Sequence, residues 1–555
     1  MKLNRLREIQ VLLDHSLFFR AVDAVLGFIQ RLFAGSILVL ALKTPAREPD
    51  ESSVFIRAVN KFFHLLAWAR DHFFQAAYEN SGWAYAMKSL GAVAQGSFFV
   101  RWLCRLLRIE LCSSDEPKWT GVVVFLFLAI TAAVGLFFFP PLYVALGAVG
   151  LFAALACLAL PEIAALAVIA AAPFLPTMLL AAMLGFLILC FCVKLLTDAC
   201  YQPAADATGL FIIVYALLGV FCGFTSLTPR DSLPIALLST LFMISYFLPI
   251  SLLRTKHLAD AALFFFCTTA AVTGVYGLVQ KVTGYMETAW VDAQLFDDLR
   301  MRIYSTFANP NVYGEYLLLA IPVCLVMVRV SRRWIAKLYY LGISLLLLYN
   351  LGFTYSRGCY LALAFAAFVC TLFMAKRLVA LFFAGLLAVP FFLPAAMLNR
   401  VASIVNMGAG DSSTQYRLNI WQGTLRILRD FWFAGVGQGI QAYNLIYPYY
   451  SLSNISTPHS HSLFLQIFVE TGVFGLLAFI GLMGAFFKTQ ISFFYKTRHV
   501  PTKWLLAGFI SAAAGFLVQG VFDYSFYNYR VLLIFFLFLG VSNAVVRVKL
   551  LSDFN

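Results

Sequence analysis

Two histidines at the start of a long apolar run are the residues best suited to acid–base chemistry. Residues 457–462 read TPHSHS, and an apolar run follows as far as Phe487. We expect an unbroken membrane helix to start at His461, with His459 in the preceding loop and facing water. A helix N-terminus disfavours imidazolium, so a neutral His461 could accept a proton near neutral pH. His461 is therefore a candidate catalytic base; the alternative is a polar residue that only marks the membrane boundary.

Three arginines suit the binding of an anion. Arg302 precedes an apolar run, Arg357 lies between two such runs, and Arg417 lies in a long polar segment, four residues before Trp421. The guanidinium group is planar, permanently charged and bidentate, which matches phosphate and pyrophosphate. An arginine between apolar helices is costly unless an anion compensates its charge. The alternative for Arg357 is an extended side chain that reaches lipid headgroups.

Two asparagines accompany these arginines. Residues 302–311 read RIYSTFANPN just before a predicted span, and residues 354–358 read TYSRG where a span returns. Asn309 and Asn311 either contribute to a site or cap a helix. We expect both segments on the same face of the membrane as the arginine–tryptophan pair and the histidines.

The composition is that of a membrane protein. Of 555 residues, 62% are hydrophobic and 12% are charged, and the mean hydropathy is +0.86. Repeated apolar runs of spanning length predict an all-α, polytopic transmembrane protein without a cleavable signal peptide. The net charge of +14 then reflects topology and contact with anionic lipid, so we expect no nucleic-acid partner. The 11 cysteines lie mostly inside apolar runs, and no disulfide framework or metal site is expected.

The chain divides into two predicted parts. In residues 1–118, basic residues interrupt short apolar patches, which predicts amphipathic helices on the membrane surface. Residues 119–555 form the predicted transmembrane domain, with 12–14 spans, because the run at 162–174 is short and prolines follow it. The expected spans are 120–138, 140–160, 162–174, 177–195, 208–226, 233–253, 259–280, 312–330, 336–354, 358–375, 378–396, 462–487, 504–522 and 529–547.

Basic residues orient these spans. With fourteen spans, the basic clusters all fall on the side of the N-terminus, which is cytoplasmic by the positive-inside rule. Both termini are then cytoplasmic, and the long segments 282–311 and 399–460 lie outside. In the second segment, Asp411 and apolar residues every three or four positions predict an interfacial helix that carries Arg417. The basic clusters are 254–256, 329–337, 376–377, 488–503 and 547–549.

The histidine motif resembles that of the O-antigen ligase and O-antigen polymerase superfamily of bacterial polytopic membrane glycosyltransferases. The family signature is His, then Asn, Ser or Gln, nine residues, Gly, two residues, and a small residue or Tyr. His461, Ser462, Gly472 and Gly475 match it in full.

Three further elements resemble family motifs in the family's order. They are residues 307–311, residues 356–358, and the pair Arg417 and Trp421. The resemblance covers roughly residues 210–539, and residues 1–118 lie outside it.

The resemblance implies a reaction on the extracytoplasmic face of the bacterial inner membrane. The donor would be a glycan on undecaprenyl pyrophosphate, and the acceptor a sugar hydroxyl of a glycan or glycolipid. Arg357 and Arg417 would hold the pyrophosphate leaving group, and His461 would orient or deprotonate the acceptor, with inversion at the sugar. No metal or cofactor is implied, because the arginines stabilise the developing charge. The residues expected to support the site or position substrate are Arg302, Asn309, Asn311, Trp421, Ser462 and Glu470.

Three alternatives stay open at this point. Ligases and repeat-unit polymerases share these motifs, so the sequence does not choose the acceptor. A non-enzymatic transporter of lipid-linked glycans should carry charges deep within many spans, whereas the charges here concentrate at span ends. A structural partner of a cell-wall synthase is opposed only by the cluster of external motifs.

Overall fold

The structure is a computed structural model that describes residues 160–197, 203–284, 302–374, 376–388, 412–451 and 457–553, with isolated residues elsewhere. The predicted surface helices of residues 1–118 and the spans 120–138 and 140–160 lie almost entirely outside the described residues. Within the described part, every regular element is a helix. Ten helices there are long and apolar enough to cross a membrane. The all-α, polytopic fold class is therefore confirmed.

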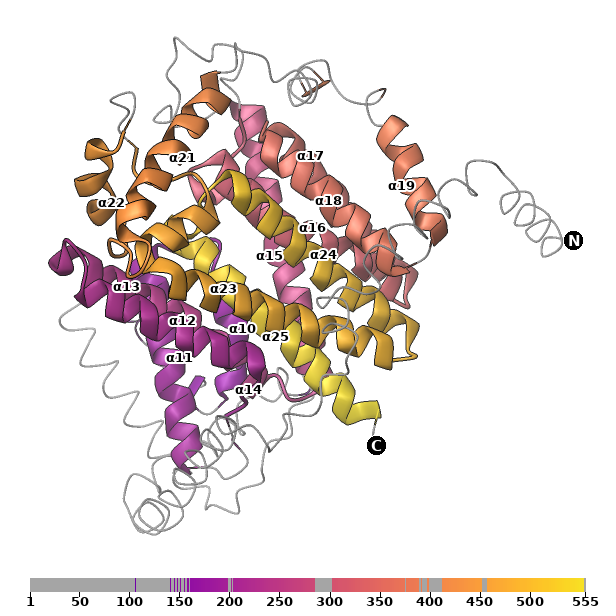
Figure 1. Cartoon of the computed structure of the whole chain (residues 1–555). Coiled ribbons are helices and arrows are strands. Elements are labelled where there is room, and N and C mark those ends of the chain that lie inside the picture. The colour runs from indigo at the N-terminus through magenta and orange to yellow at the C-terminus, as the bar shows by residue number, and fades with distance from the viewer. Residues whose placement is uncertain are drawn as a thin grey trace, which may run out of the picture. The chain divides into compact units, whose positions relative to one another are not determined.

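The long described helices follow the predicted spans closely (Figure 1). Their bounds are α10 (Pro161–Ala171), α11 (Thr177–Thr197), α12 (Ala207–Phe224), α13 (Pro229–Ile244), α14 (Phe247–Leu252), α15 (Lys256–Thr283), α16 (Pro310–Val330), α17 (Trp334–Phe353), α18 (Arg357–Met374), α19 (Lys376–Ala388), α21 (Ser412–Phe431), α22 (Ile440–Ile446), α23 (Leu463–Lys496), α24 (Val500–Phe522) and α25 (Tyr529–Asp553).

Two predicted spans correspond to short helices in the described part of the chain. Helix α10 ends at Ala171, and α11 begins only at Thr177, beyond the two prolines. The described helix α19 covers 13 residues, and most of residues 389–396 of the same predicted span lie outside the described residues. The amphipathic helix expected around Arg417 is present as α21.

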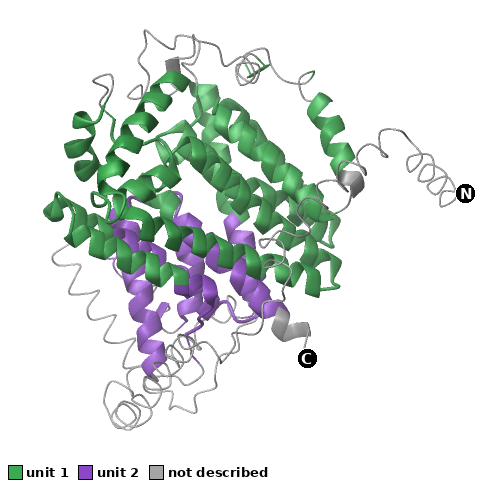
Figure 2. Cartoon of the chain, in the orientation of Figure 1, with its two compact units in different colours: residues 1–47, 211–237, 267–532 green, residues 48–210, 238–266, 533–555 purple. Residues whose placement is uncertain are grey.

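The chain forms two compact units (Figure 2). Among the described residues, unit 1 contains residues 211–237 and 267–532, and unit 2 contains residues up to 210, 238–266 and those from 533 onward. Unit 2 has its own buried polar cluster, in which Asp206 accepts hydrogen bonds from Tyr246 Oη at 2.6 Å and Asn543 Nδ2 at 3.0 Å. Every candidate site residue belongs to unit 1.

Small residues allow the helices of unit 1 to pack closely. Helix α24 lies against both α16 and α18 (Figure 1). A Cβ atom on Gly508 would lie 2.6 Å from Val326 Cγ2, and one on Gly515 would lie 3.1 Å from the Ala362 carbonyl oxygen. Close backbone approach through small residues is a usual way for membrane helices to associate.

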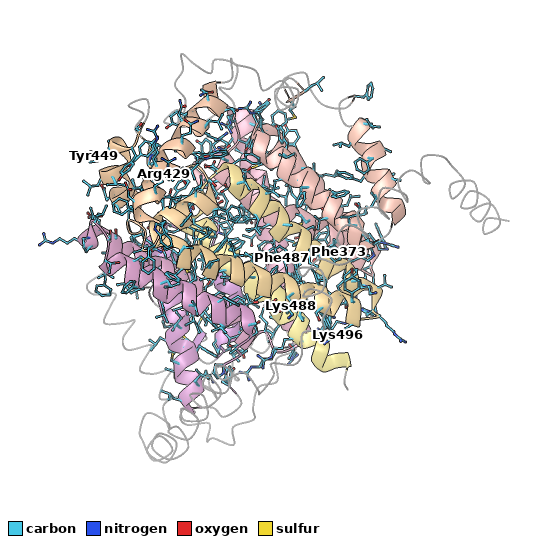
Figure 3. All side chains as sticks on the ribbon, in the orientation of Figure 1. Phe373, Arg429, Tyr449, Phe487, Lys488 and Lys496 are labelled. Atoms are coloured by element: carbon cyan, nitrogen blue, oxygen red, sulfur yellow. The ribbon has the colours of Figure 1, made fainter. Side chains whose placement is uncertain are left out.

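Short connections make successive helices of unit 1 run in alternate directions, so their connections gather at two ends. We call one the site end; it contains the connections 302–309, 354–356, 457–462 and 523–528. We call the other the basic end; it contains 331–333 and 497–499, with Arg332, Arg333 and Arg498. Figure 3 labels Arg429 and Tyr449 in one region of this unit. It labels Lys488 and Lys496, which belong to α23, in another region.

Candidate active site

The backbone of the site end is unusual. Four described non-glycine residues have positive φ: Ser305 (51°), Ala308 (61°), Tyr355 (50°) and His461 (51°). They all lie in the connections that precede α16, α18 and α23. Such conformations are uncommon for residues with a Cβ atom and tend to occur where surrounding contacts fix a functional geometry.

Contacts on several sides hold the first of these strained residues. The Ser305 N–H donates to Gln280 Oε1 at 2.8 Å, and its carbonyl oxygen accepts from Gln280 Nε2 at 3.1 Å. The Ser305 hydroxyl donates to the Thr273 carbonyl oxygen at 2.7 Å. These bonds fix the start of the segment that carries the two asparagines.

His461 pairs with a carboxylate that the sequence analysis missed. His461 Nδ1 lies 3.3 Å from Asp523 Oδ1, and the two side chains are 22% and 7% exposed. With Nδ1–H donating to Asp523, His461 Nε2 has a lone pair that can accept a proton. The Asp523 carbonyl oxygen also accepts from the Leu463 N–H at 3.1 Å, which ties it to the start of α23. The pair has the arrangement of a general base and the group that orients it.

Asp523 is stabilised as an anion. Burial by itself would raise the pKa of this carboxyl, but the hydrogen bond and charge of His461 and the charge of Arg417 outweigh burial and hold the pKa below its usual range. Asn311 Nδ2 adds a donor to Asp523 Oδ2 at 3.0 Å. The carboxylate can therefore stabilise an imidazolium on His461.

A series of hydrogen bonds joins the connections of the site end. Arg302 Nη2 donates to Asn311 Oδ1 at 2.9 Å, and Arg302 Nε donates to the Thr354 carbonyl oxygen at 2.7 Å. Asn311 in turn donates to Asp523. Arg302 and Asn311 therefore support Asp523 and, through it, His461, and Asn311 does not cap a helix through its side chain in this arrangement.

Asn309 does cap a helix. Its Oδ1 accepts from the Asn311 N–H at 2.9 Å at the start of α16. Its Nδ2 donates to Tyr527 Oη at 2.9 Å. Asn309 thus combines both roles that the sequence left open, because it caps a helix and also holds an aromatic ring of the site.

The expectation that His459 faces water is wrong. His459 is 6% exposed, and its ring stacks on Tyr527 with centroids 5.0 Å apart. Its Nδ1 accepts from the His461 N–H at 3.2 Å. Burial and the neighbouring His461 lower the pKa of His459 to about 3, so this imidazole is neutral near pH 7. Its position supports the backbone of His461.

Helix α21 brings three side chains to the histidine connection. Trp421 Nε1 lies 3.4 Å from the His461 carbonyl oxygen, to which it donates. The Tyr416 ring meets the His461 ring edge-on at 5.9 Å. Arg417 is half-buried, and its charge acts on both Asp523 and His459. Two of the predicted site residues, Arg417 and Trp421, therefore accompany His461.

Arg357 lies on a neighbouring connection. It is the half-buried first residue of α18 and follows the strained Tyr355. Arg302 Nε donates to the carbonyl oxygen of Thr354, which lies three residues before Arg357. Two residues later, Cys359 Sγ approaches the Asn311 carbonyl oxygen at 3.9 Å. Arg357 is thus at the site end, in a segment tied to the same series of hydrogen bonds.

Ser462 and Glu470 have supporting places. Ser462 is the buried N-cap residue of α23, and its carbonyl oxygen accepts from Ser460 Oγ at 3.0 Å. Glu470 Oε1 accepts from Gln466 Nε2 at 2.9 Å and from the Gly439 N–H at 3.3 Å. Gln466 Oε1 accepts from the Ser460 N–H at 2.7 Å. Glu470 therefore reaches the histidine connection through Gln466.

A profile of the family described as O-antigen ligase matches residues 342–480. The match includes Arg357, Arg417 and His461, and it does not include Arg302 or Asp523. The expected resemblance to the O-antigen ligase superfamily is confirmed. No curated protein matches the chain significantly. The protein is a multi-pass membrane protein, and the similarity of residues 342–480 to the O-antigen ligase family points to cell-surface polysaccharide biosynthesis.

The O-antigen ligase signature includes a glycine that breaks α23. Gly472 has φ 68° and ψ −172°, so the predicted unbroken helix is kinked. The kink allows the Val473 N–H to donate to the Trp432 carbonyl oxygen at 2.8 Å. A Cβ atom on Gly472 would lie 2.1 Å from the Phe433 carbonyl oxygen, and one on Gly475 would lie 1.9 Å from Thr471 Oγ1. Close backbone approach and a positive φ therefore require glycine at position 472, whereas a Cβ atom at position 475 would displace the Thr471 side chain.

Asp523 and Tyr527 are the main site residues that the sequence analysis missed. Both lie in the short connection between the predicted spans 504–522 and 529–547. A carboxylate directly after an apolar span was the available signal for Asp523. Tyr527 carried no comparable signal, because its stacking on His459 depends on the tertiary structure.

Among the described residues, one grouping could hold a metal ion. Ligand atoms of His459, His461 and Asp523 lie within 4.8 Å of one another. However, His459 Nδ1 already accepts the His461 N–H, and His461 Nδ1 faces Asp523. A metal ion that used these atoms would have to replace both interactions. The geometry favours the hydrogen-bonded pair.

Proposed function

We propose that the protein transfers a glycan from an undecaprenyl-pyrophosphate donor to a sugar hydroxyl of a glycan or glycolipid acceptor. The observation that carries this proposal is the His461–Asp523 pair with Arg417 beside it. A base oriented by a carboxylate can activate a hydroxyl, and guanidinium groups stabilise a departing pyrophosphate. The catalytic region lies within the transmembrane domain of residues 119–555.

The reaction needs one bond to form and one to break. The acceptor oxygen attacks the anomeric carbon of the donor while its proton passes to His461 Nε2. The bond from that carbon to the pyrophosphate oxygen breaks, and the configuration at the carbon inverts. Arg357 and Arg417 bind the pyrophosphate as its negative charge develops. Asp523 stabilises the imidazolium until the proton leaves.

We further propose that the site end faces the outside of the bacterial inner membrane. Its support is the contrast with the basic end, because connections rich in arginine and lysine stay in the cytoplasm. Cysteine variants of two labelled residues in Figure 3, Tyr449→Cys and Lys496→Cys, test it with an impermeant thiol reagent on spheroplasts. Tyr449→Cys should label in intact spheroplasts, and Lys496→Cys only after lysis. The reverse pattern would contradict the proposal.

The function is tested by the glycans of a deletion strain. Mass spectrometry of undecaprenyl-linked intermediates should find accumulated donor. Full-length lipid-linked polymer would indicate a ligase, and single repeats would indicate the polymerase of the same superfamily. An unchanged set of intermediates and an unchanged surface glycan would reject a glycosyltransferase of either kind and favour a transporter or a structural partner.

A metal-independent reaction is part of the proposal. Purified protein given a lipid-linked donor should keep its rate in excess EDTA, because arginines supply the positive charge. Loss of the rate in EDTA with recovery on adding a divalent ion would instead assign a metal to His459, His461 and Asp523.

A further inference from the structure

We infer that Glu315 of α16 carries a proton and positions the Asp523–His461 pair from the protein interior. Glu315 is 1% exposed, and neither of its carboxyl oxygens has a hydrogen-bond partner. It lies four residues beyond Asn311, on the same helix, and Asp523 is close enough to interact with it electrostatically. The proton is inferred from structure alone, whereas the positioning role rests on the proposed function.

Two more buried polar groups surround this carboxyl group. Ser525 and Gln519 lie within interaction range of Glu315 and are 0% and 2% exposed. Ser525 Oγ and Gln519 Oε1 also have no hydrogen-bond partner. Three side chains thus leave four polar atoms unsatisfied in one place, and leaving such atoms unpaired is costly.

A single proton resolves this cluster. An ionised carboxylate only accepts hydrogen bonds, and so does the amide oxygen of Gln519. A protonated Glu315 can donate its O–H to Gln519 Oε1, and its other oxygen can accept the hydroxyl proton of Ser525. This single proton would give each of the three side chains a hydrogen-bond partner.

The charges nearby favour the same state. Asp523 is anionic, and two carboxylates in one buried site do not both ionise easily. Cys359 and Tyr527 also interact electrostatically with Glu315, and neither adds positive charge. The negative charge of the pair is therefore kept on Asp523, where it faces His461.

Burial alone does not explain the state of Glu315. Glu470 of α23 is also buried, at 6% exposed, but it accepts hydrogen bonds from Gln466, Gly439 and, at 3.4 Å, Tyr524 Oη. The Glu470 carboxylate thus accepts from three donors, whereas neither carboxyl oxygen of Glu315 accepts a hydrogen bond. The difference lies in the neighbouring groups and assigns the proton to Glu315.

Infrared spectroscopy of purified protein tests the proton directly. The difference spectrum between wild type and Glu315→Gln near pH 7 should contain the carbonyl band of a neutral carboxylic acid, and this band should shift in D2O. A carboxylate band in its place, with or without dependence on an added cation, would overturn the inference. This measurement does not depend on glycan transfer.

Activity tests the positioning role. Glu315→Gln keeps a donor for Gln519 and an acceptor for Ser525, so it should transfer glycan at nearly the wild-type rate. Glu315→Leu fills a similar volume but leaves both neighbours unpaired, and its rate should fall about tenfold. A large loss in Glu315→Gln, or equal rates in both variants, would overturn the role. If wild type transfers no glycan, the proposed function fails, and the infrared result still decides the proton.

Discussion

The two ends of unit 1 connect the same helices in very different ways. At the basic end, Ser331, Arg333, Thr497 and His499 all have φ between −65° and −78°. At the site end, connections between similar helices contain four residues with positive φ and buried polar side chains. The fold can therefore join its helices without strain. The strain at the site end has another cause, which we assign to the placing of His461 and its partners.

The largest expected effect is that of His461→Ala. Loss of a general base typically lowers a rate by about 10² to 10⁴, and the His461 side chain is only half-buried. The measurement is glycan transfer at matched membrane levels. The matched control is His499→Ala at the basic end, which should leave the rate unchanged. If His461→Ala is as active as His499→Ala, the strained backbone of the site end does not serve catalysis by His461.

The next effect is that of replacing arginine by lysine. An ammonium group keeps the charge but does not reproduce two parallel hydrogen bonds to pyrophosphate. Arg357→Lys and Arg417→Lys should each lower the rate roughly ten- to a hundredfold, the value of a lost charge-assisted hydrogen bond. Arg333→Lys at the basic end is the control and should have no effect. Near-normal rates in both lysine variants would mean that Arg357 and Arg417 only contact lipid headgroups.

Asp523→Asn tests how the base is oriented. The amide cannot stabilise imidazolium as a carboxylate does, so the rate should fall roughly tenfold or more while the substrate concentration at half-maximal rate changes little. Circular dichroism of the purified variant should match wild type. A normal rate would show that His461 acts without its carboxylate partner.

The smallest effect concerns stability and His459. Its pKa is about 3 in the folded protein and about 6.5 in an unfolded chain. The unfolded state binds more protons between these values, so the free energy of unfolding falls as the pH drops below about 6.5. Asp523 titrates at lower pH. Denaturation between pH 7.5 and 5 should show this slope, and His459→Phe, which keeps an aromatic ring, should reduce it. Equal slopes would contradict the burial of His459.

The sequence predicted the helices well and the site in part. Apolar runs located α12 and α15–α18, because length and hydropathy are local properties. The positions of His461 and Arg357 at span ends, and of Arg417 on an amphipathic helix, were also readable locally. The burial of His459 was not, because Tyr527 lies 68 residues away in sequence. The kink at Gly472 was hidden for a similar reason, since the Phe433 carbonyl oxygen that requires a glycine there belongs to another segment.

The series of hydrogen bonds from Thr354 through Arg302 and Asn311 to Asp523 and His461 has a consequence for dynamics. Each member holds the next, so breaking one releases the others. The first turns of α16, α18 and α23 should then open together, as one cooperative unit in amide hydrogen exchange. The exchange rates of these turns would rise in parallel in a variant such as Arg302→Ala. Bound pyrophosphate would slow all of them, including amides that it does not touch.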